Sequence, residues 1–565
     1  MKKTERKNRV SYFWCHAGAL LFACFMVFGR SFEKTDSWEL VLGGTPEILL
    51  SLLQGIGWYL AFLLGIYGLF RCLDHAFVSE SRGGAAFCPP GWLRLLAAPF
   101  RKYWEMVQNL PFKTVFCTLL LVNLPYMALS YPGIFMGDSS SQISQGLGEA
   151  ELTNHHPVTH TLILSAFLHL GEWIGDDNAG IFLYCLAQAV LVCAALAYAA
   201  GALVKIPAGK LLVAGVLLYD CLQPRISAYL FLVTKDVPYS ACFTLFYVTL
   251  IQLFRRRLSR GEAALLGISA VGMVLLRNDG KFVVVLSLAA ALFCRRCRKT
   301  AGICLAAAVI AAAGVSRIVL PAIGAEPGSI REMLSVPFQQ TARYVRDAGG
   351  DITDEEAEVI GRVLDFGSLA EIYDPDISDN VKATYHGSAE DLKDYFGVWF
   401  RMLLRHPGIY IQATMNNYYQ YFYPGEVLFN NYSYSWSESI METINERLDT
   451  DFHYPEALRG LRDGYESLRE DLFSLPLLSL FNTPALYTWA AILYLCYCLY
   501  RRSLIGFLAG VPMIVQMLIF ITGPTNGFYC RYEYAMLLYL PAVLPLGLKL
   551  MKTAEEEPAL LSRRR

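Results

Sequence analysis

The sequence predicts an all-α polytopic membrane protein with about 12–14 transmembrane helices and a small, mostly helical extracytoplasmic domain. Of its 565 residues, 55% are hydrophobic and 13% are aromatic, which is too apolar for a soluble globular protein. Several apolar runs reach the roughly 20 residues that a helix needs to cross a bilayer. The formal net charge of −1 hides two regions of opposite charge.

The apolar runs set the predicted spans. They lie at 11–29, 47–70, 114–130, 157–174, 179–203, 209–222, 225–234, 237–254, 262–277, 282–294, 301–320, 484–500, 503–522 and 532–550. We expect the first run to be an uncleaved helix, because it contains no small-residue cleavage site. The runs on either side of Gln223-Pro224-Arg225 are short, so the sequence leaves open whether 209–234 crosses the membrane once or twice.

Basic residues concentrate in a few segments between the runs. These segments are the N-terminus, 71–113, 255–257, 295–299, 501–502 and 563–565. The positive-inside rule places them in the cytoplasm together with both chain termini. The long segment 321–472 and four shorter polar segments then lie outside, the shorter ones being 131–157, 234–236, 277–281 and 523–531. The sequence therefore predicts a multi-pass protein of the cytoplasmic (plasma) membrane with an extracytoplasmic segment 321–472.

Segment 321–472 is strongly acidic. It holds 27 Asp and Glu against 12 Lys and Arg, which leaves 22 against 36 in the rest of the chain. Capping pairs at Thr353 with Glu356 and at Ser388 with Asp391 predict helix starts, so we expect a small helical domain. The segment contains no cysteine and is expected to fold without disulfides. Its aromatic-rich second half predicts either an interfacial belt or a sugar-stacking platform.

These patterns divide the chain into four predicted parts. Residues 1–113 form two N-terminal spans and a cytoplasmic amphipathic segment. Residues 114–320 form a transmembrane module that includes the first external loop, 131–157. Residues 321–472 form the acidic domain, and 473–565 form the C-terminal spans and a cytoplasmic tail.

The loop 131–157 is the predicted active-site loop, because ionisable groups are costly at a membrane face and mark a functional site by default. Asp138 is a candidate general base, and His155 and His156 are candidates for acid–base chemistry or metal binding. The structural alternatives are a turn at Asp138 and a helix cap before Pro157. Metal ligation by His156 with His160, four residues apart, is a further alternative.

Positive charges in the other short polar segments suit a phosphate group. A basic clamp stabilises charge that develops on a leaving phosphate, while a carboxylate activates the incoming nucleophile. The structural alternatives are a local Lys235–Asp236 ion pair at a helix start and arginines that snorkel to lipid headgroups. The predicted substrate-binding residues are Gln142, Lys235, Asp236, Arg277, Asp279, Arg531 and Tyr532.

The chain resembles the GT-C superfamily of multi-spanning glycosyltransferases, which includes protein O-mannosyltransferases and aminoarabinose transferases. The resemblance rests on an Asp in the first external loop, Asn154–His160, Thr234–Pro238, the Arg277–Gly280 turn and a late Arg-Tyr pair. The stretch Arg331–Arg346, with Tyr421–Pro424, is similar to an uncharacterised, mainly Gram-positive family of membrane proteins usually grouped with that superfamily.

The resemblance implies an inverting transfer of sugar from a polyprenyl-phosphate carrier to an acceptor glycan, lipid or protein. Asp138 would be the base, and Lys235, Arg277 and Arg531 would contact the carrier phosphate. Asp138 is followed by three serines and not by a second acid. Metal-dependent members of the superfamily carry paired acids in this loop, so the resemblance leaves the use of a divalent metal open and implies no other cofactor.

Two rival functions remain from the sequence. A transporter or lipid flippase for cell-envelope precursors would also gather charges, although near the bilayer midplane and within internal repeats, of which we find none. A non-catalytic envelope assembly protein would display 321–472 and carry its membrane charges incidentally. We expect membrane lipids as surroundings and no nucleic acid or soluble nucleotide as partner, since no phosphate-cradling glycine loop is present.

Overall fold

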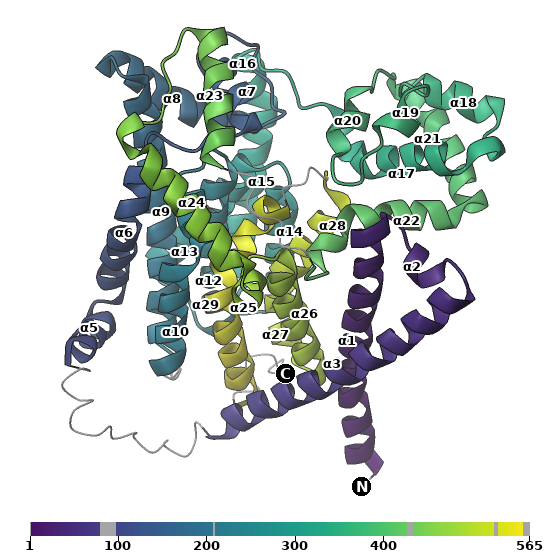
Figure 1. The fold of residues 1–565 in the computed structure, drawn as a ribbon. Coiled ribbons are helices and arrows are strands. Elements are labelled where there is room, and N and C mark those ends of the chain that lie inside the picture. The colour runs from purple at the N-terminus through teal and green to yellow at the C-terminus, as the bar shows by residue number, and fades with distance from the viewer. Residues whose placement is uncertain (1, 80–97, 207–209, 426–432, 525–528, 557–565) are drawn as a thin grey trace.

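The computed structural model describes residues 2–79, 98–206, 210–425, 433–524 and 529–556 (Figure 1). Within these residues every regular element is a helix, and the only β-type contacts are two isolated bridges. In the described part of the chain, seven helices are long and apolar enough to cross a membrane, and three shorter apolar helices accompany them. The predicted all-α, multi-pass membrane fold is therefore confirmed.

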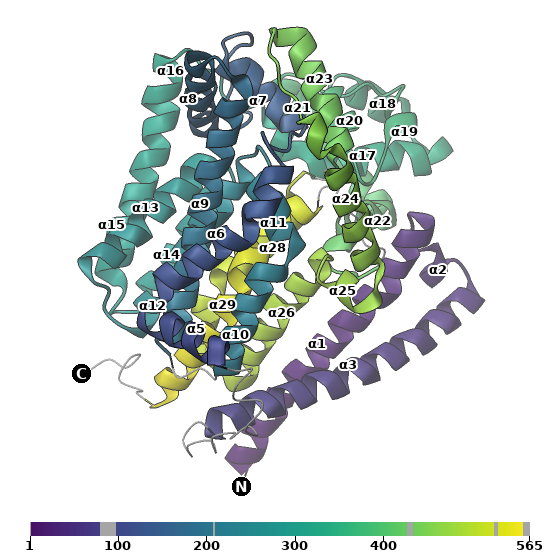
Figure 2. The ribbon, with the colours of Figure 1, turned by 60° about the vertical axis from the view of Figure 1, so that its left-hand side comes forward.

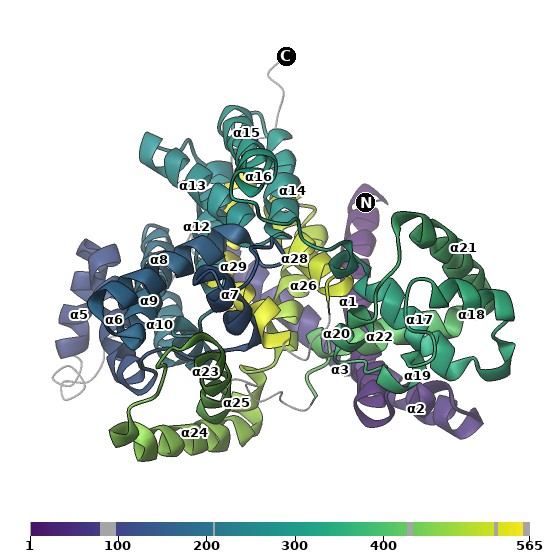
Figure 3. The ribbon, with the colours of Figure 1, turned by 90° about the horizontal axis from the view of Figure 1, so that it is seen from above.

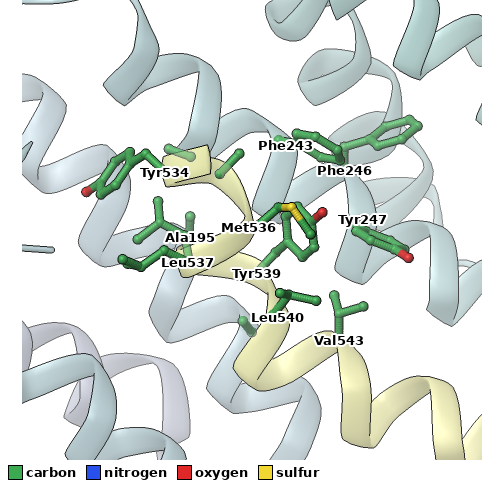
Figure 4. Packing of buried hydrophobic residues seen from close by; sticks show 14 of the residues in the cluster. Ala195, Phe243, Phe246, Tyr247, Tyr534, Met536, Leu537, Tyr539, Leu540 and Val543 are labelled. Atoms are coloured by element: carbon green, nitrogen blue, oxygen red, sulfur yellow. The ribbon is translucent and has the colours of Figure 1, made fainter. Parts of the chain in front are cut away.

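The long apolar helices and several shorter ones form one bundle around a continuous core. Its members are α1 (Lys2–Thr35), α3 (Thr45–Ser79), α6 (Pro111–Leu129), α9 (Asp177–Val204), α10 (Lys210–Leu222), α12 (Asp236–Arg255), α13 (Arg260–Leu276), α14 (Gly280–Leu292), α15 (Arg298–Gly314), α26 (Pro484–Arg501), α27 (Leu504–Ala509), α28 (Val511–Thr522) and α29 (Tyr529–Glu556). At the centre, Tyr539 of α29 packs against Phe243 and Tyr247 of α12, with ring centroids 4.9 and 5.0 Å apart (Figure 4). This packing fixes the start of α29 beside the start of α12.

Shorter helices connect and cover the bundle. They are α2 (Glu39–Leu42), α5 (Ala98–Asn109), α7 (Gly137–Gly146), α8 (Val158–Ile174), α11 (Pro224–Leu230), α16 (Leu320–Ala322), α17 (Ser335–Asp347), α18 (Asp354–Gly361), α19 (Leu369–Ile372), α20 (Ser378–Ala383), α21 (Ala389–Arg405), α22 (Pro407–Tyr418), α23 (Tyr434–Leu448), α24 (Arg459–Ser474) and α25 (Pro476–Leu480). The first part of the predicted amphipathic segment, around Pro89–Trp92, lies outside the described residues.

The described parts of the basic segments gather at one end of the bundle. Arg296 donates to the backbone oxygen of Arg255 at 2.7 Å, and Arg501 pairs with Asp74 at 2.6 Å. We call this the basic end; the first described turns of α1 and the last turn of α29 lie at this end in Figure 1. The opposite end carries 131–157, 234–236 and 277–281, with α17 to α21 beside it, and we call it the polar end. The grouping agrees with the charge pattern of the sequence.

Residues 210–234 run once from the basic end to the polar end. Helix α10 ends at Leu222. At the break, the Gln223 side chain accepts a hydrogen bond from Arg225 N at 3.2 Å and donates one to the Phe481 oxygen at 2.9 Å. After α11 the chain lies beside the first loop, where Ile134 N donates to the Phe231 oxygen at 2.7 Å. Residues 210–234 thus pass through the bundle once, with a break near the polar end.

Helix α8 begins and ends at the polar end, so the apolar run 157–174 does not cross the bundle. Its end meets the start of α9, where Asn178 donates to the Asp451 oxygen at 2.8 Å. The turn is possible because Gly175 adopts a left-handed conformation with φ of 80°. A Cβ on Gly180 would lie only 2.6 Å from the Phe167 oxygen, so the two helices approach closely. Apolarity alone could not distinguish this folded-back helix from a span.

The acidic segment contains two structural parts. Helices α17 to α22 enclose their own core, which includes Phe338, Tyr344 and Tyr395. The predicted capped starts are confirmed at α18 and α21, where both capping boxes form. By contrast, α23 contributes to the bundle core through Met441 and Ile444. Both parts share an acidic composition, so the sequence could not separate them.

Several aromatic side chains of this segment are buried. Tyr421 stacks on Phe520 with centroids 4.3 Å apart, and Tyr434 packs edge-on against Tyr454 at 5.4 Å. Tyr410 lies in the core of α17 to α22. These three rings serve as packing groups in the protein interior.

Candidate functional site

The first loop is held against the backbone that precedes α12. Ser139 donates to the Val233 oxygen at 2.7 Å, and Phe135 N donates to Ser437 Oγ at 2.7 Å. These contacts place Asp138, in the first turn of α7, directly above the starts of α12 and α29. Figure 3 shows α7 over this central part of the polar end.

Asp138 meets positive charges from two distant segments. Its Oδ2 atom lies 2.6 Å from Lys235 Nζ and 3.2 Å from Arg531 Nη2. His156 Nδ1 lies 3.7 Å from the same oxygen and 3.0 Å from Lys235 Nζ. Charges almost 400 positions apart in the chain therefore converge on one carboxylate, as the sequence predicted.

Asp236 joins Arg277 to the same cluster. Its side chain is 1% exposed and lies 2.5 Å from Arg277 Nη1 and 3.1 Å from Arg531 Nε. Thr234 Oγ1 also donates to Asp236 at 3.0 Å. The alternative of a local Lys235–Asp236 ion pair is wrong. Lys235 pairs with Asp138, whereas Asp236 pairs with Arg277 and Arg531.

The remaining contacts of Arg277 define the outer side of the site. Asp279 binds it with two oxygens, at 2.9 and 2.7 Å. The Tyr532 ring lies beneath both Arg277 and Arg531, with the guanidinium carbons 5.4 and 5.0 Å from its centroid. Such stacking leaves guanidinium edges available for hydrogen bonds. Both arginines are paired with carboxylates, and their side chains are only 11% and 7% exposed, so snorkelling to lipid headgroups does not describe them.

Two predicted site residues do not join the cluster. Gln142 is buried and donates to Thr161 at 3.0 Å, while its oxygen lies 3.1 Å from His160 Nδ1. His155 turns to Glu332, at 3.7 Å. Gln142 lies one helical turn after Asp138, and its side chain points into the protein. It therefore supports the packing of α7 on α8.

The metal alternative at His156 and His160 is wrong. His160 places its second ring nitrogen 2.6 Å from the Tyr184 hydroxyl, while His156 precedes α8 and faces Lys235. In the described part of the chain, no group of three or more His, Cys, Asp or Glu side chains is arranged to hold a metal ion. Asn154 does cap α8, since its Oδ1 accepts from Val158 N at 3.1 Å.

The electrostatics of the loop set two protonation states. Burial raises the pKa of Asp138, but Arg531 and Lys235 outweigh it and hold that pKa well below its usual range. Burial, aided by the Lys235 charge, lowers the pKa of His156 to about 2. At neutral pH the carboxylate is therefore charged and the imidazole neutral.

Two groups were missed by sequence reasoning. Glu332 pairs with Lys382 at 2.7 Å and reaches His155, so it links α17 to α22 with the loop. Arg225 and Glu533 form a buried pair at 2.9 Å next to the site. Arg225 lies in the apolar run 225–234 and Glu533 in the apolar run 532–550. These two isolated opposite charges could have indicated the pair.

The cluster is electrically balanced. Lys235, Arg277 and Arg531 are matched by Asp138, Asp236 and Asp279. An anion that enters must compete with a carboxylate for these cations. Because each cation is already held in place, this competition requires small side-chain movements and no rearrangement of helices.

We expect His156 to make stability depend on pH. The unfolded chain takes up a proton at this residue below about pH 6.5, whereas the folded protein keeps it neutral, so stability falls as pH drops. The wild-type protein should lose about 2 kcal/mol more than His156→Gln between pH 7 and pH 5. Denaturant unfolding at both pH values measures this difference, with exposed His169→Gln as the matched control. Equal pH dependence of wild type and His156→Gln would contradict the burial of a neutral ring.

The chain belongs to a family of unknown function, DUF6020, whose family model matches residues 147–559. The matched region includes Lys235, Asp236, Arg277 and Arg531 but begins after Asp138. No curated protein and no solved structure matches the chain. The family is thus established, and the function must be argued from the site.

Proposed function

We propose that this protein is a membrane glycosyltransferase of the GT-C type. It transfers a sugar from a polyprenyl-phosphate carrier to an acceptor at the outer face of the cytoplasmic membrane, with inversion at the anomeric carbon. The polar end is the outer face, because the basic segments at the other end belong in the cytoplasm. The observation that carries the proposal is the convergence of Asp138 with Lys235 and Arg531 at 2.6 and 3.2 Å.

The reaction is a single displacement. The acceptor hydroxyl oxygen attacks the anomeric carbon, and the bond from that carbon to the phosphate oxygen breaks. The proton of the hydroxyl passes to Asp138, and the phosphate keeps the electron pair. Lys235, Arg277 and Arg531 stabilise the charge that develops on the leaving phosphate.

The balanced charges explain how a strongly acidic carboxyl group can act as a base. Paired with two cations, Asp138 is a poor proton acceptor, because a general base works best with a pKa near the operating pH. A carrier phosphate that binds Lys235 and Arg531 withdraws them from the carboxylate, and the pKa of Asp138 rises. The base is thus activated only when the donor is bound.

The rival functions explain these observations less well. A transporter needs charges near the bilayer midplane, whereas this cluster lies at the polar end beside the loop 131–157. A non-catalytic assembly protein gives no reason to gather three carboxylates and three cations in one cluster. Transport and assembly remain the alternatives that the assay must separate.

The test is transfer by purified protein in lipid vesicles. We expect wild-type protein to move labelled sugar from a short-chain polyprenyl-phosphate sugar to a lipid or glycan acceptor and to release polyprenyl phosphate. Empty vesicles and heat-inactivated protein are the controls. Movement of the intact donor between leaflets, without release of polyprenyl phosphate, would instead indicate a flippase.

A further inference from the structure

A second positively charged site lies under α24, and it uses none of the residues around Asp138. Arg462 is only 4% exposed. Its Nη1 atom is buried without a hydrogen-bond partner, and Arg462 forms no ion pair with the described residues. The guanidinium lies over the Tyr454 ring, with its carbon atom 4.9 Å from the ring centroid. A buried charge without a partner is costly, so this arginine indicates an anion that binds there.

A second arginine lies on the same face of the helix. Arg469 is two turns further along α24 and 8% exposed. Arg469 forms an ion pair with Glu466 at 3.9 Å. The Glu466 carboxylate also accepts a hydrogen bond from Tyr434 N at 2.7 Å. Glu466 thus pairs with Arg469, and no ion pair to Arg462 is found among the described residues. Guanidinium groups are the side chains best suited to bind phosphate oxygens.

The surroundings of α24 point to a lipid as the source of the anion. Figure 2 shows this helix descending along the side of the bundle to α25. The adjoining face of α24 exposes Leu468 and Leu472, at 56% and 41%, and Leu475 and Leu478 beyond it are 51% and 40% exposed. Buried arginines beside exposed leucines match a molecule with an anionic head and apolar chains.

We propose that Arg462 and Arg469 bind the phosphate of an anionic membrane lipid whose chains lie along the exposed leucines of α24 and α25. The site is next to the first loop, because the Tyr454 hydroxyl donates to the Gly133 oxygen at 3.0 Å. The bound phosphate supplies the missing partner of Arg462. This inference does not depend on the transfer of sugar.

The experiment measures thermal unfolding of the purified full-length protein in detergent with added lipid. Phosphatidylglycerol should raise the wild-type midpoint by several degrees more than phosphatidylcholine does. Arg462→Gln should lose at least half of that shift, and Arg462→Lys, which keeps the charge, should retain most of it. Arg459→Gln, an exposed arginine of the same helix, is the matched control and should keep the whole shift.

Three results would overturn the proposal. The first is an equal response of wild type to the two lipids, and the second is a full phosphatidylglycerol shift in Arg462→Gln. The third is an equal shift with inorganic phosphate alone, which would assign a soluble anion. Without added lipid, Arg462→Gln should unfold at the same or a higher temperature than wild type, since it removes an unpaired charge. A large fall there would contradict the absence of a partner within the protein.

Discussion

Replacing Asp138 with Asn is expected to lower sugar transfer by about 100-fold to 10,000-fold, the range that general base catalysis contributes. Asn keeps the size of the side chain but cannot accept the proton from the acceptor hydroxyl. Binding of the carrier phosphate should persist, because Lys235 and Arg531 remain and lose a competitor. Transfer per amount of folded protein, measured in vesicles, tests this expectation.

The control for this variant is Asp451→Asn. Asp451 belongs to the acidic segment, and its side chain is 89% exposed, so the same chemical change there should leave transfer unaltered. Equal activities of the two variants would show that Asp138 is not the base. A loss of donor binding in Asp138→Asn would contradict the proposed competition between the carboxylate and the phosphate.

Replacing Asp236 with Asn is expected to destabilise the protein by roughly 3–5 kcal/mol, the cost of breaking a buried ion pair from one side. Asp236 is 1% exposed and pairs with both Arg277 and Arg531. In this variant Arg531 remains paired with Asp138, and Arg277 remains paired with Asp279. The two guanidinium groups, however, then face one another across a neutral side chain. Unfolding in detergent, followed by denaturant titration, measures the loss.

Asp279→Asn is the matched variant for Asp236. Asp279 binds the same arginine but is 25% exposed, so water replaces part of what the substitution removes. We expect a loss of about 1 kcal/mol or less, as for ion pairs near the surface. A larger loss at Asp279 than at Asp236 would mean that the buried carboxylate is not the anchor of the cluster.

The position of the site could be predicted from the sequence because charge inside apolar surroundings has few explanations. Asp138, Lys235, Arg277 and Arg531 each stand at the edge of an apolar run, and the basic segments indicated that all four share one end of the bundle. Their contacts could not be predicted, since pairing depends on where helices end in three dimensions. Lys235 and Asp236 are adjacent in sequence yet turn to different partners.

Helix boundaries and packing were less predictable. The run 157–174 has the composition of a span, but a left-handed glycine and a close glycine contact fold it back at the polar end. Gln142 and His155 have the right chemistry in the right loop, but local packing points them toward Thr161 and Glu332. Nothing in a single sequence records which face of a short helix is buried.

Cysteine labelling in intact cells tests the central claim most directly, namely that the polar segments gather at the outer face. Glu151 lies in the first loop and Arg257 in a basic segment, and both are exposed. With a membrane-impermeant maleimide, Glu151→Cys should react in intact cells, and Arg257→Cys should react only after lysis. Labelling of Arg257→Cys from outside, with Glu151→Cys protected until lysis, would place the cluster in the cytoplasm and contradict the account.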